Sequence, residues 1–143
     1  MAVRVTEIGF AARVCALMLC AYTGFTAVSG EAQSPALAML DRLEPGLWQV
    51  YPLGASSTNM QFCIDNGRRL IQIRHPRESC KRFVIQDTPG TVTVQYTCPA
   101  GGYGHTKLRF ENPRLVQLET QGIDDGLPFN FAAEVRRIGA CRP

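Results

Sequence analysis

The sequence has few of the residues and motifs from which enzyme activity is usually inferred. Its 143 residues include only two histidines, and neither lies in an H-E-x-x-H pair or another metal-ligand spacing. No G-x-S-x-G motif surrounds a serine, so a hydrolase nucleophile has no sequence signature. The sequence therefore predicts no cofactor, no metal site and no catalytic residue, and it leaves the biochemical activity unassigned.

Closely spaced cysteine pairs are also missing, which argues against a zinc site. Four cysteines follow the first 60 residues of the chain, at Cys63, Cys80, Cys98 and Cys141. Zinc sites usually take their ligands from pairs such as C-x-x-C, and no such pair occurs here. An even number of cysteines in a small exported domain instead predicts two disulfides.

The pairing of these cysteines is open, and we favour Cys63–Cys80 together with Cys98–Cys141. The alternative, Cys80–Cys98 with Cys63–Cys141, would staple the open end of the hairpin expected over residues 81–96. It requires two cysteines directly opposite each other, whereas the apolar faces of that hairpin match better in a register shifted by one residue. Because a one-residue slip turns every side chain to the other face, only one of these registers can hold throughout a regular hairpin.

No apolar run is long enough to cross a membrane. Residues 14–28 carry no charge and follow the basic residues Arg4 and Arg13, but a spanning helix needs about 20 apolar residues. Small residues follow the run and fit cleavage by signal peptidase near Ala32. This pattern is typical of a secretory signal.

We therefore expect residues 1–32 to be a signal peptide that is removed, and residues 33–143 to form one disulfide-stapled domain outside the cytosol. The mature chain would have no transmembrane span. An alternative is lipid attachment at Cys20, although Leu19 occupies a position where that motif has a small residue.

After the signal, alternation of apolar and polar residues predicts a mainly β fold. Short turns rich in glycine, proline, serine and asparagine separate the alternating runs. The runs cover residues 47–51, 60–64, 81–86, 91–96, 106–111, 116–120 and 129–135. We expect an antiparallel meander of about seven strands, as a strongly curled sheet or partly closed barrel with one buried face.

One or two short helices complete the prediction. Ser34-Pro35 is typical of a helix start, because serine caps the first turn and proline has no N–H to lose there. Leucines follow at helical spacing, at Leu37, Leu40 and Leu43. The segment from Asp65 to Pro76 fits a short helix as well as a strand.

The only glycine-rich loop, Gly101–Gly104, precedes a strand rather than a helix, so it does not predict a phosphate cradle. Its glycines would allow positive φ in a tight connection. Tyr103 and His105 would lie at a pocket mouth if the loop shapes one. A hydrolase-like enzyme would need His105 to meet Asp124 or Glu111.

Six basic residues cluster within the fifteen residues 68–82, opposed only by Glu78. Together they predict a surface patch for an anionic envelope component such as lipid or polysaccharide. The cluster consists of Arg68, Arg69, Arg74, Arg77, Lys81 and Arg82. Nucleic acid is not expected as a partner, because stacking aromatics are not interleaved with these residues.

Three features together resemble a family of small exported bacterial proteins. They are the segment LEPGLWQV at residues 43–50, the cysteines at intervals through the domain, and RRIGAC at residues 136–141. The family is the domain of unknown function family 3617. The resemblance implies a Gram-negative envelope location and a single β-rich domain, and it brings no activity, cofactor or catalytic residue.

The leading hypothesis is a non-enzymatic binding or accessory protein of the envelope, whose partner the sequence does not identify. If the sheet encloses a cavity, a small apolar ligand would lie among its aromatic side chains. Those side chains are Trp48, Phe62, Tyr96, Phe110 and Phe129.

Overall fold

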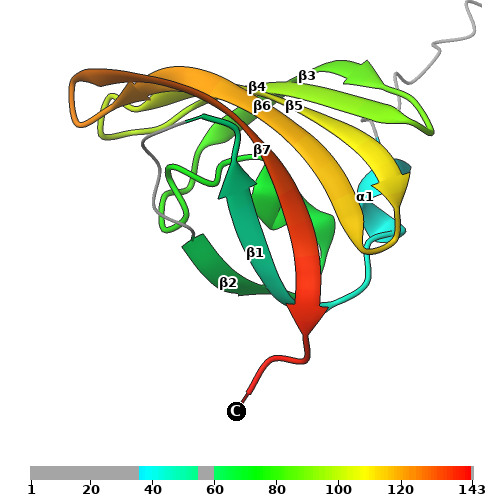
Figure 1. Ribbon diagram of the computed structural model, residues 1–143. Coiled ribbons are helices and arrows are strands. Elements are labelled where there is room, and N and C mark those ends of the chain that lie inside the picture. Colours follow the sequence, from blue (N-terminus) through cyan, green and yellow to red (C-terminus); the bar gives the residue numbers. More distant parts are fainter. Residues whose placement is uncertain (1–35, 55–59, 143) are drawn as a thin grey trace, which may run out of the picture. The chain divides into compact units, whose positions relative to one another are not determined.

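A computed structural model describes residues 36–54 and 60–142. These residues are mainly β, with seven antiparallel strands in one sheet, one short α-helix and one 3-10 helix (Figure 1). In chain order the elements are α1 (Ala38–Asp41), β1 (Gly46–Pro52), β2 (Met60–Ile64), η1 (Gly67–Leu70), β3 (Lys81–Asp87), β4 (Thr91–Thr97), β5 (Tyr103–Asn112), β6 (Leu115–Asp124) and β7 (Leu127–Gly139). No helix among them is long and apolar enough to cross a membrane. The expected signal peptide, Cys20 and Ser34-Pro35 lie outside the described residues.

The strands are arranged in the order β2-β1-β7-β6-β5-β4-β3. Strands β3 to β7 follow one another as a meander, and β1 returns to pair with β7, so the first strand lies beside the last. β2 and β3 form the two edges of the sheet, which is open. The antiparallel meander is confirmed, and the strongly curled sheet or partly closed barrel is not.

The buried face of the sheet carries the alternating apolar residues that the sequence predicts. α1 lies against β4 and η1, on the same side as the core (Figure 1). The largest fully buried side chains on the strands are Trp48, Val50, Val92, Val94, Tyr96, Leu108, Val116 and Leu118. One face therefore packs against the two helices and their connections, as expected for an antiparallel sheet with one solvated face.

The first helix is shorter than its leucine spacing predicts. α1 contains only four residues, and Leu37 just before it has a left-handed backbone with φ of 53°. The N–H of Leu37 donates to Asp87 Oδ2 at 3.0 Å, which ties the start of the helix to the end of β3. Leu37, Leu40 and Leu43 are all buried, so the predicted packing of the leucines is confirmed although the helix is a single turn.

The disulfides are Cys80–Cys98 and Cys63–Cys141, so the favoured pairing was wrong and the alternative is correct. Cys80–Cys98 joins the start of β3 to the end of β4, with its Cα atoms 4.1 Å apart. Cys63–Cys141 links β2 to the segment that follows β7 and spans 78 residues of sequence. Together the two bonds fasten both edge strands of the sheet.

The favoured pairing failed because it assumed that the apolar face of β3 sets the register. Phe83 and Ile85 instead face solvent, at 70% and 50% exposure. The register of β3 against β4 therefore does not have to bring these two side chains to the buried face. Near the cysteines the hairpin keeps the register that places them opposite each other, and a β-bulge between Val84 and Gln86 then shifts it by one residue. Both registers weighed from the sequence occur, one on each side of the bulge.

Candidate functional site

The segment between β2 and β3 carries most of the basic cluster and folds over the core. Asn66 caps the 3-10 helix η1, because its side chain accepts from the Arg68 N–H at 3.0 Å. Leu70 and Ile71 are fully buried beneath it. The segment is thus a 3-10 turn followed by further turns, neither the regular helix nor the strand that its apolar residues permit.

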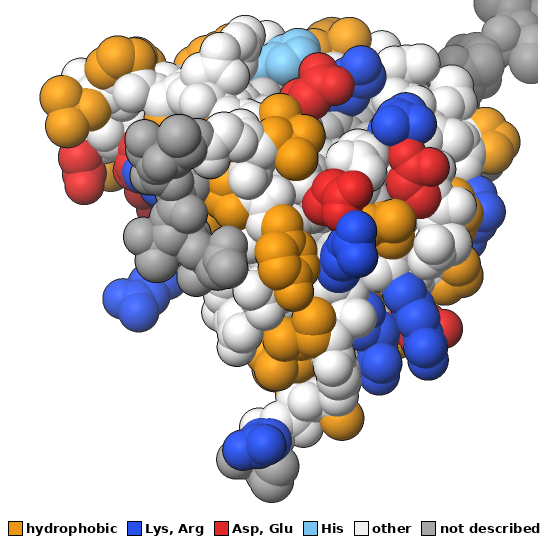
Figure 2. All heavy atoms as spheres, viewed as in Figure 1, with side chains coloured by type: hydrophobic (Ala, Val, Ile, Leu, Met, Phe, Trp, Pro, Cys, Tyr) orange, Lys and Arg blue, Asp and Glu red, His pale blue; other side chains and the backbone are white. Residues whose placement is uncertain are grey.

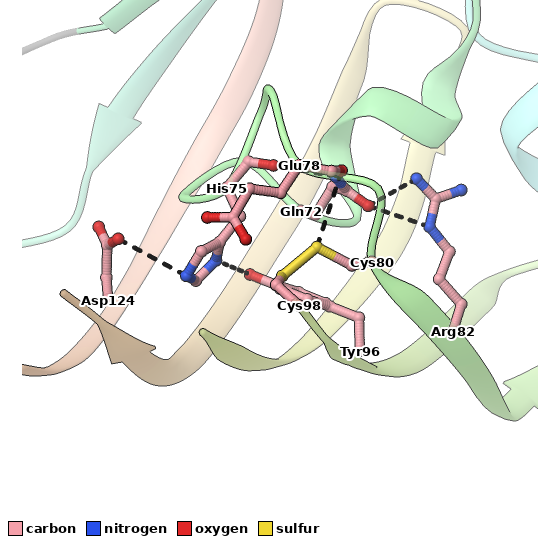
Figure 3. Close-up of a disulfide and its surroundings, with 8 residues drawn as sticks. All are labelled: Gln72, His75, Glu78, Cys80, Arg82, Tyr96, Cys98 and Asp124. Carbon is pink, nitrogen blue, oxygen red and sulfur yellow. Dashed lines mark hydrogen bonds and ion pairs between the residues drawn. A yellow bond between two sulfur atoms is a disulfide. The ribbon is translucent and has the colours of Figure 1, made fainter. Parts of the chain in front are cut away.

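A buried amide holds the rest of this segment together. Gln72 Nε2 donates to the carbonyl oxygens of His75 and Glu78, at 2.9 and 2.7 Å. Its Oε1 accepts from Arg82 Nε and Nη2, at 3.2 and 2.8 Å. Figure 3 shows Gln72 between the loop and the guanidinium of Arg82, beside the Cys80–Cys98 disulfide. One side chain therefore fixes both the turn of the loop and the direction of a strand β3 arginine.

His75 anchors the loop to the sheet. Its side chain is 1% exposed, with Nδ1 3.1 Å from the Tyr96 hydroxyl and Nε2 3.5 Å from Asp124 Oδ1 (Figure 3). Arg74 Nη2 donates to the same carboxylate at 2.8 Å. Burial, with a smaller contribution from Asp124, raises the pKa of Tyr96 to about 12. Tyr96 therefore keeps its proton at neutral pH, and its hydroxyl and Nδ1 of His75 share one hydrogen bond.

This Asp124–His75–Tyr96 arrangement positions the loop and offers no place for a substrate. Tyr96 and the histidine ring are each 1% exposed, and Phe129 covers the ring with a centroid separation of 6.1 Å. A general base must lie within hydrogen-bond reach of the proton that it takes from a substrate. We therefore assign these side chains a structural task, which is to fix the 65–80 loop on the sheet.

No metal-ligand spacing in the sequence singles out His75, but the glycine loop is an indirect signal of its position. A Cβ on Gly102 would overlap His75 Nε2, and one on Gly104 would overlap the Tyr96 ring. Only Gly101 of this loop has a positive φ, 89°. Gly102 and Gly104 are thus required because side chains pack directly on their backbone, whereas positive φ accounts only for Gly101.

The basic residues of the cluster divide into groups with different partners. Arg68 forms an ion pair with Asp41, and this guanidinium holds the pKa of the carboxyl below its usual value. Arg74 is bound to Asp124. Arg69 Nη1 donates to the Cys63 carbonyl oxygen at 2.6 Å. Arg77 and Lys81 have no hydrogen-bond or ion-pair partner for their side chains within residues 36–54 and 60–142.

Four of these arginines line two adjoining hollows in the surface. The smaller hollow, of about 240 Å³, is lined by Asp65, Asn66, Arg68, Arg69, Gln72, Pro76 and Arg82. The larger, of about 440 Å³, is lined by Met60, Gln61, Phe62, Arg69, Ile73, Pro76 and Arg77. Because Arg69 and Pro76 line both, the hollows are neighbours, and we call them together the arginine groove.

The arginine groove is positively charged. Its lining contains four guanidinium groups and one carboxylate, that of Asp65. Of the four, Arg68 is offset by Asp41, while no ion pair among the described residues involves Arg69, Arg77 or Arg82. On the face drawn in Figure 2, basic and acidic side chains lie next to one another.

His105 lines a separate hollow of about 420 Å³ over β5, β6 and β7, together with Lys107, Glu119, Gln121 and Asn130. Tyr103, half-buried at the first residue of β5, is not part of this lining. Within the part of the chain that the structure describes, no hydrogen bond or ion pair joins His105 to Asp124 or Glu111. Asp124 binds Arg74, and Glu111 binds Arg109. The two acidic partners proposed for His105 are thus engaged with arginines.

The five aromatic side chains expected around an apolar ligand are not gathered in one cavity. Trp48 and Tyr96 are part of the filled core. Phe110 lies beneath the Arg42 guanidinium, 3.7 Å from its ring centroid, and Phe129 lies beside His75. Phe62 alone of the five lines the arginine groove.

Glu78, Cys80 and Cys98 are close enough together to resemble a metal site. Their ligand atoms lie within 4.8 Å of one another. Metal binding by cysteine requires the thiolate, and here the two sulfur atoms are bonded to each other. The cluster is therefore a disulfide with a neighbouring carboxylate.

Comparison with protein-family models, with curated proteins and with solved structures finds no match for this chain. Its function must therefore be inferred from its own residues. Among the described residues, the arginine groove best combines a concave surface with charges that lack partners.

Proposed function

We propose that this protein is a non-enzymatic binding module that holds an anionic group, such as a phosphate or carboxylate, in the arginine groove. One observation carries the proposal: Arg68, Arg69, Arg77 and Arg82 line two hollows that share a wall. Guanidinium groups present several N–H donors in a plane that matches the oxygens of carboxylate and phosphate. Their convergence on one concave surface favours such a ligand over a neutral one.

The support of the groove favours binding over general solvation of a charged face. Arg82 is fixed by two hydrogen bonds to Gln72, and Arg69 by one to the Cys63 carbonyl oxygen. Each immobilised long side chain otherwise costs about 0.5–1.5 kcal/mol of conformational entropy on binding. Because these two arginines are already held in place, they lose less conformational entropy when a ligand binds.

The cellular location that we propose follows from the cysteines and the N-terminal residues. The two disulfides indicate an oxidising, non-cytosolic compartment. We propose export by a signal peptide over residues 1–32, a periplasmic location and membership of family 3617, with lipid attachment at Cys20 as the alternative form. Under this proposal, the anionic component recognised by the groove belongs to the bacterial envelope.

The proposal is tested by replacing charged side chains of the groove with neutral ones. In the variant R69Q/R77Q/R82Q the three arginines that lack carboxylate partners become neutral. The matched control R109Q/R114Q/R136Q removes the same charge from exposed arginines outside the groove. Binding of inorganic pyrophosphate is followed by NMR chemical shifts and calorimetry at low ionic strength, where screening is weakest.

We expect pyrophosphate to shift the resonances of residues 65–82 in the wild-type protein and in the control. The groove variant should bind at least about tenfold more weakly, because the loss of one charge-assisted hydrogen bond costs roughly 1.5–3 kcal/mol. Equal loss in both variants would mean that net charge alone attracts the anion. That result, or wild-type shifts scattered over the surface, would refute the proposal.

A further inference from the structure

We propose that the ligand of the groove is amphiphilic, with an anionic head and a single alkyl chain, an inference that rests on the proposed function. The two hollows differ in chemistry although they share a wall. Polar groups of Asn66, Gln72, Arg68 and Arg82 line the smaller one. The larger one combines apolar side chains with two of the arginines. An anion without an apolar part would leave the apolar portion of this surface in water.

The apolar wall of the larger hollow is formed by Met60, Phe62 and Ile73. Met60 and Phe62 alternate along β2 and therefore point to the same face of the sheet. Both are partly buried and pack against the core, and Ile73 is itself a core residue. The wall is thus supported from beneath and does not depend on the ligand for its shape.

The arginines define where the head of such a ligand would lie. Arg69 lines both hollows, and Arg77 stands beside the apolar wall in the larger one. Neither has an ion-pair partner among residues 36–54 and 60–142. Because Arg69 lines both hollows, a head group bound there would lie between the hollow that Arg82 lines and the hollow that Phe62 lines. The charges therefore favour an anionic amphiphile, because a neutral apolar molecule could not form ion pairs with these arginines.

The size of the larger hollow suits this ligand. Its volume of about 440 Å³ falls within the range of about 300–1,000 Å³ that is usual for sites of small molecules. β2 is an edge strand of the sheet, so no further strand of the described residues lies along its outer side. A flexible chain can therefore lie along the wall without displacing an element of the fold.

The test compares monoalkyl phosphates of increasing length, from ethyl to octyl phosphate, below the concentrations at which they aggregate. Inorganic phosphate and the alcohol of each chain length serve as further probes. We expect affinity to rise by up to about fourfold per methylene while the chain still meets the wall, as transfer from water predicts. Each alcohol should bind at least about tenfold more weakly than its phosphate, because it cannot engage the arginines.

Two variants locate the chain. Met60→Gln keeps the length of the side chain and removes its apolar character, and Leu127→Gln makes the same kind of change at an exposed residue outside the groove. We expect Met60→Gln to flatten the dependence of affinity on chain length and to retain binding of inorganic phosphate. Because Met60 packs partly against the core, the melting temperature of this variant is measured to show that it is folded under the conditions of the assay. Phe62→Gln, which makes the same wall polar at a neighbouring position, replaces Met60→Gln if that variant folds poorly. Leu127→Gln should bind as the wild type does.

The outcomes separate the inference from the proposed function. Phosphate binding in the groove without dependence on chain length would overturn the amphiphile and leave the anion site in place. The inference would likewise be wrong if affinity still rose with chain length in the same way after Met60 or Phe62 had been substituted. The alkyl chain would then lie elsewhere. Absence of binding by inorganic phosphate and by every alkyl phosphate would overturn both.

Discussion

Raising the pH should destabilise the protein through one buried tyrosine. Tyr96 is 1% exposed and its hydroxyl faces His75. Burial raises its pKa from an ordinary value of about 10 to about 12. Below pH 10 the folded and unfolded states both hold the proton, so pH has no effect through this group. Between pH 10 and 12 the unfolded chain releases the proton first, and the free energy of unfolding must fall.

The size of the effect follows from the two pKa values. Each unit of difference corresponds to about 1.36 kcal/mol, so the two units of Tyr96 correspond to roughly 2.7 kcal/mol once the pH exceeds both values. Tyr96→Phe removes the titrating group and with it this part of the pH dependence. The same substitution also removes the hydrogen bond to His75, which should cost about 1 kcal/mol at every pH in this window. The stability curves of the wild type and Tyr96→Phe should therefore converge or cross as the pH rises.

The assay is urea unfolding at several values between about pH 9 and about pH 12, followed by tryptophan fluorescence. Trp48 is the only tryptophan and is fully buried, so its emission reports loss of the core. Mass spectrometry checks that both disulfides survive each pH. Thr106→Val, which removes a buried hydrogen bond to Thr120 and no titrating group, is the control and should keep the slope of the wild type. Parallel curves for wild type and Tyr96→Phe from pH 10 to 12 would refute the reasoning.

Two further predictions concern the disulfides and the glycine loop. Trypsin digestion without reduction should yield peptide 78–81 linked to peptide 83–107, which establishes the Cys80–Cys98 bond; peptide 78–81 linked to 43–68 would contradict it. Gly102→Ala should lower the free energy of unfolding by about 1–3 kcal/mol, because its methyl group would overlap a buried histidine that is held on both sides. Gly90→Ala, where a methyl group meets nothing within 4 Å, is its control, and equal loss in urea unfolding at both sites would count against close packing as the cause.

The strands could be predicted from the sequence because their signal is local. The apolar residues of 91–96 and 106–111 alternate with polar ones, and these runs became β4 and β5. The neighbour of β1 could not be predicted in the same way, since its pairing with β7 joins segments that are far apart in the sequence. The helix start at Ser34-Pro35 was a local signal too, but the helix itself is the single turn Ala38–Asp41.

The register of the β3–β4 hairpin shows why local patterns failed at the disulfides. Apolar residues usually mark the buried face of a strand, but Phe83 and Ile85 are exposed and Val84 packs on the core. The covalent bond between Cys80 and Cys98 requires a register that the apolar pattern alone did not favour. The bulge after Val84 then changes that register. Residues 84–86 contain no glycine, the residue type that often indicates a bulge in a sequence.

The basic cluster could be predicted as a group, but its members are not equivalent. Their charges are alike in the sequence, whereas the structure gives Arg74 a carboxylate partner, leaves Arg77 without a partner among the described residues, and fixes Arg82 through an amide. That amide, Gln72, is a buried residue with no special pattern around it. Its role depends on contacts with a loop carbonyl and a strand side chain, which appear only when the chain is folded.

The contribution of a guanidinium to anion affinity depends on two properties. Its charge must not be neutralised by a carboxylate of the protein, and its orientation must be fixed before the ligand binds. Arg68 has a fixed geometry, but Asp41 already offsets its charge. Arg77 has a free charge, but nothing described in the fold holds it. Arg69 and Arg82 combine both properties, because their partners are a carbonyl oxygen and an amide oxygen, which orient a guanidinium without neutralising it. These two arginines should therefore account for most of the anion affinity, and the buried loop that orients them is as much a part of the site as the charges themselves.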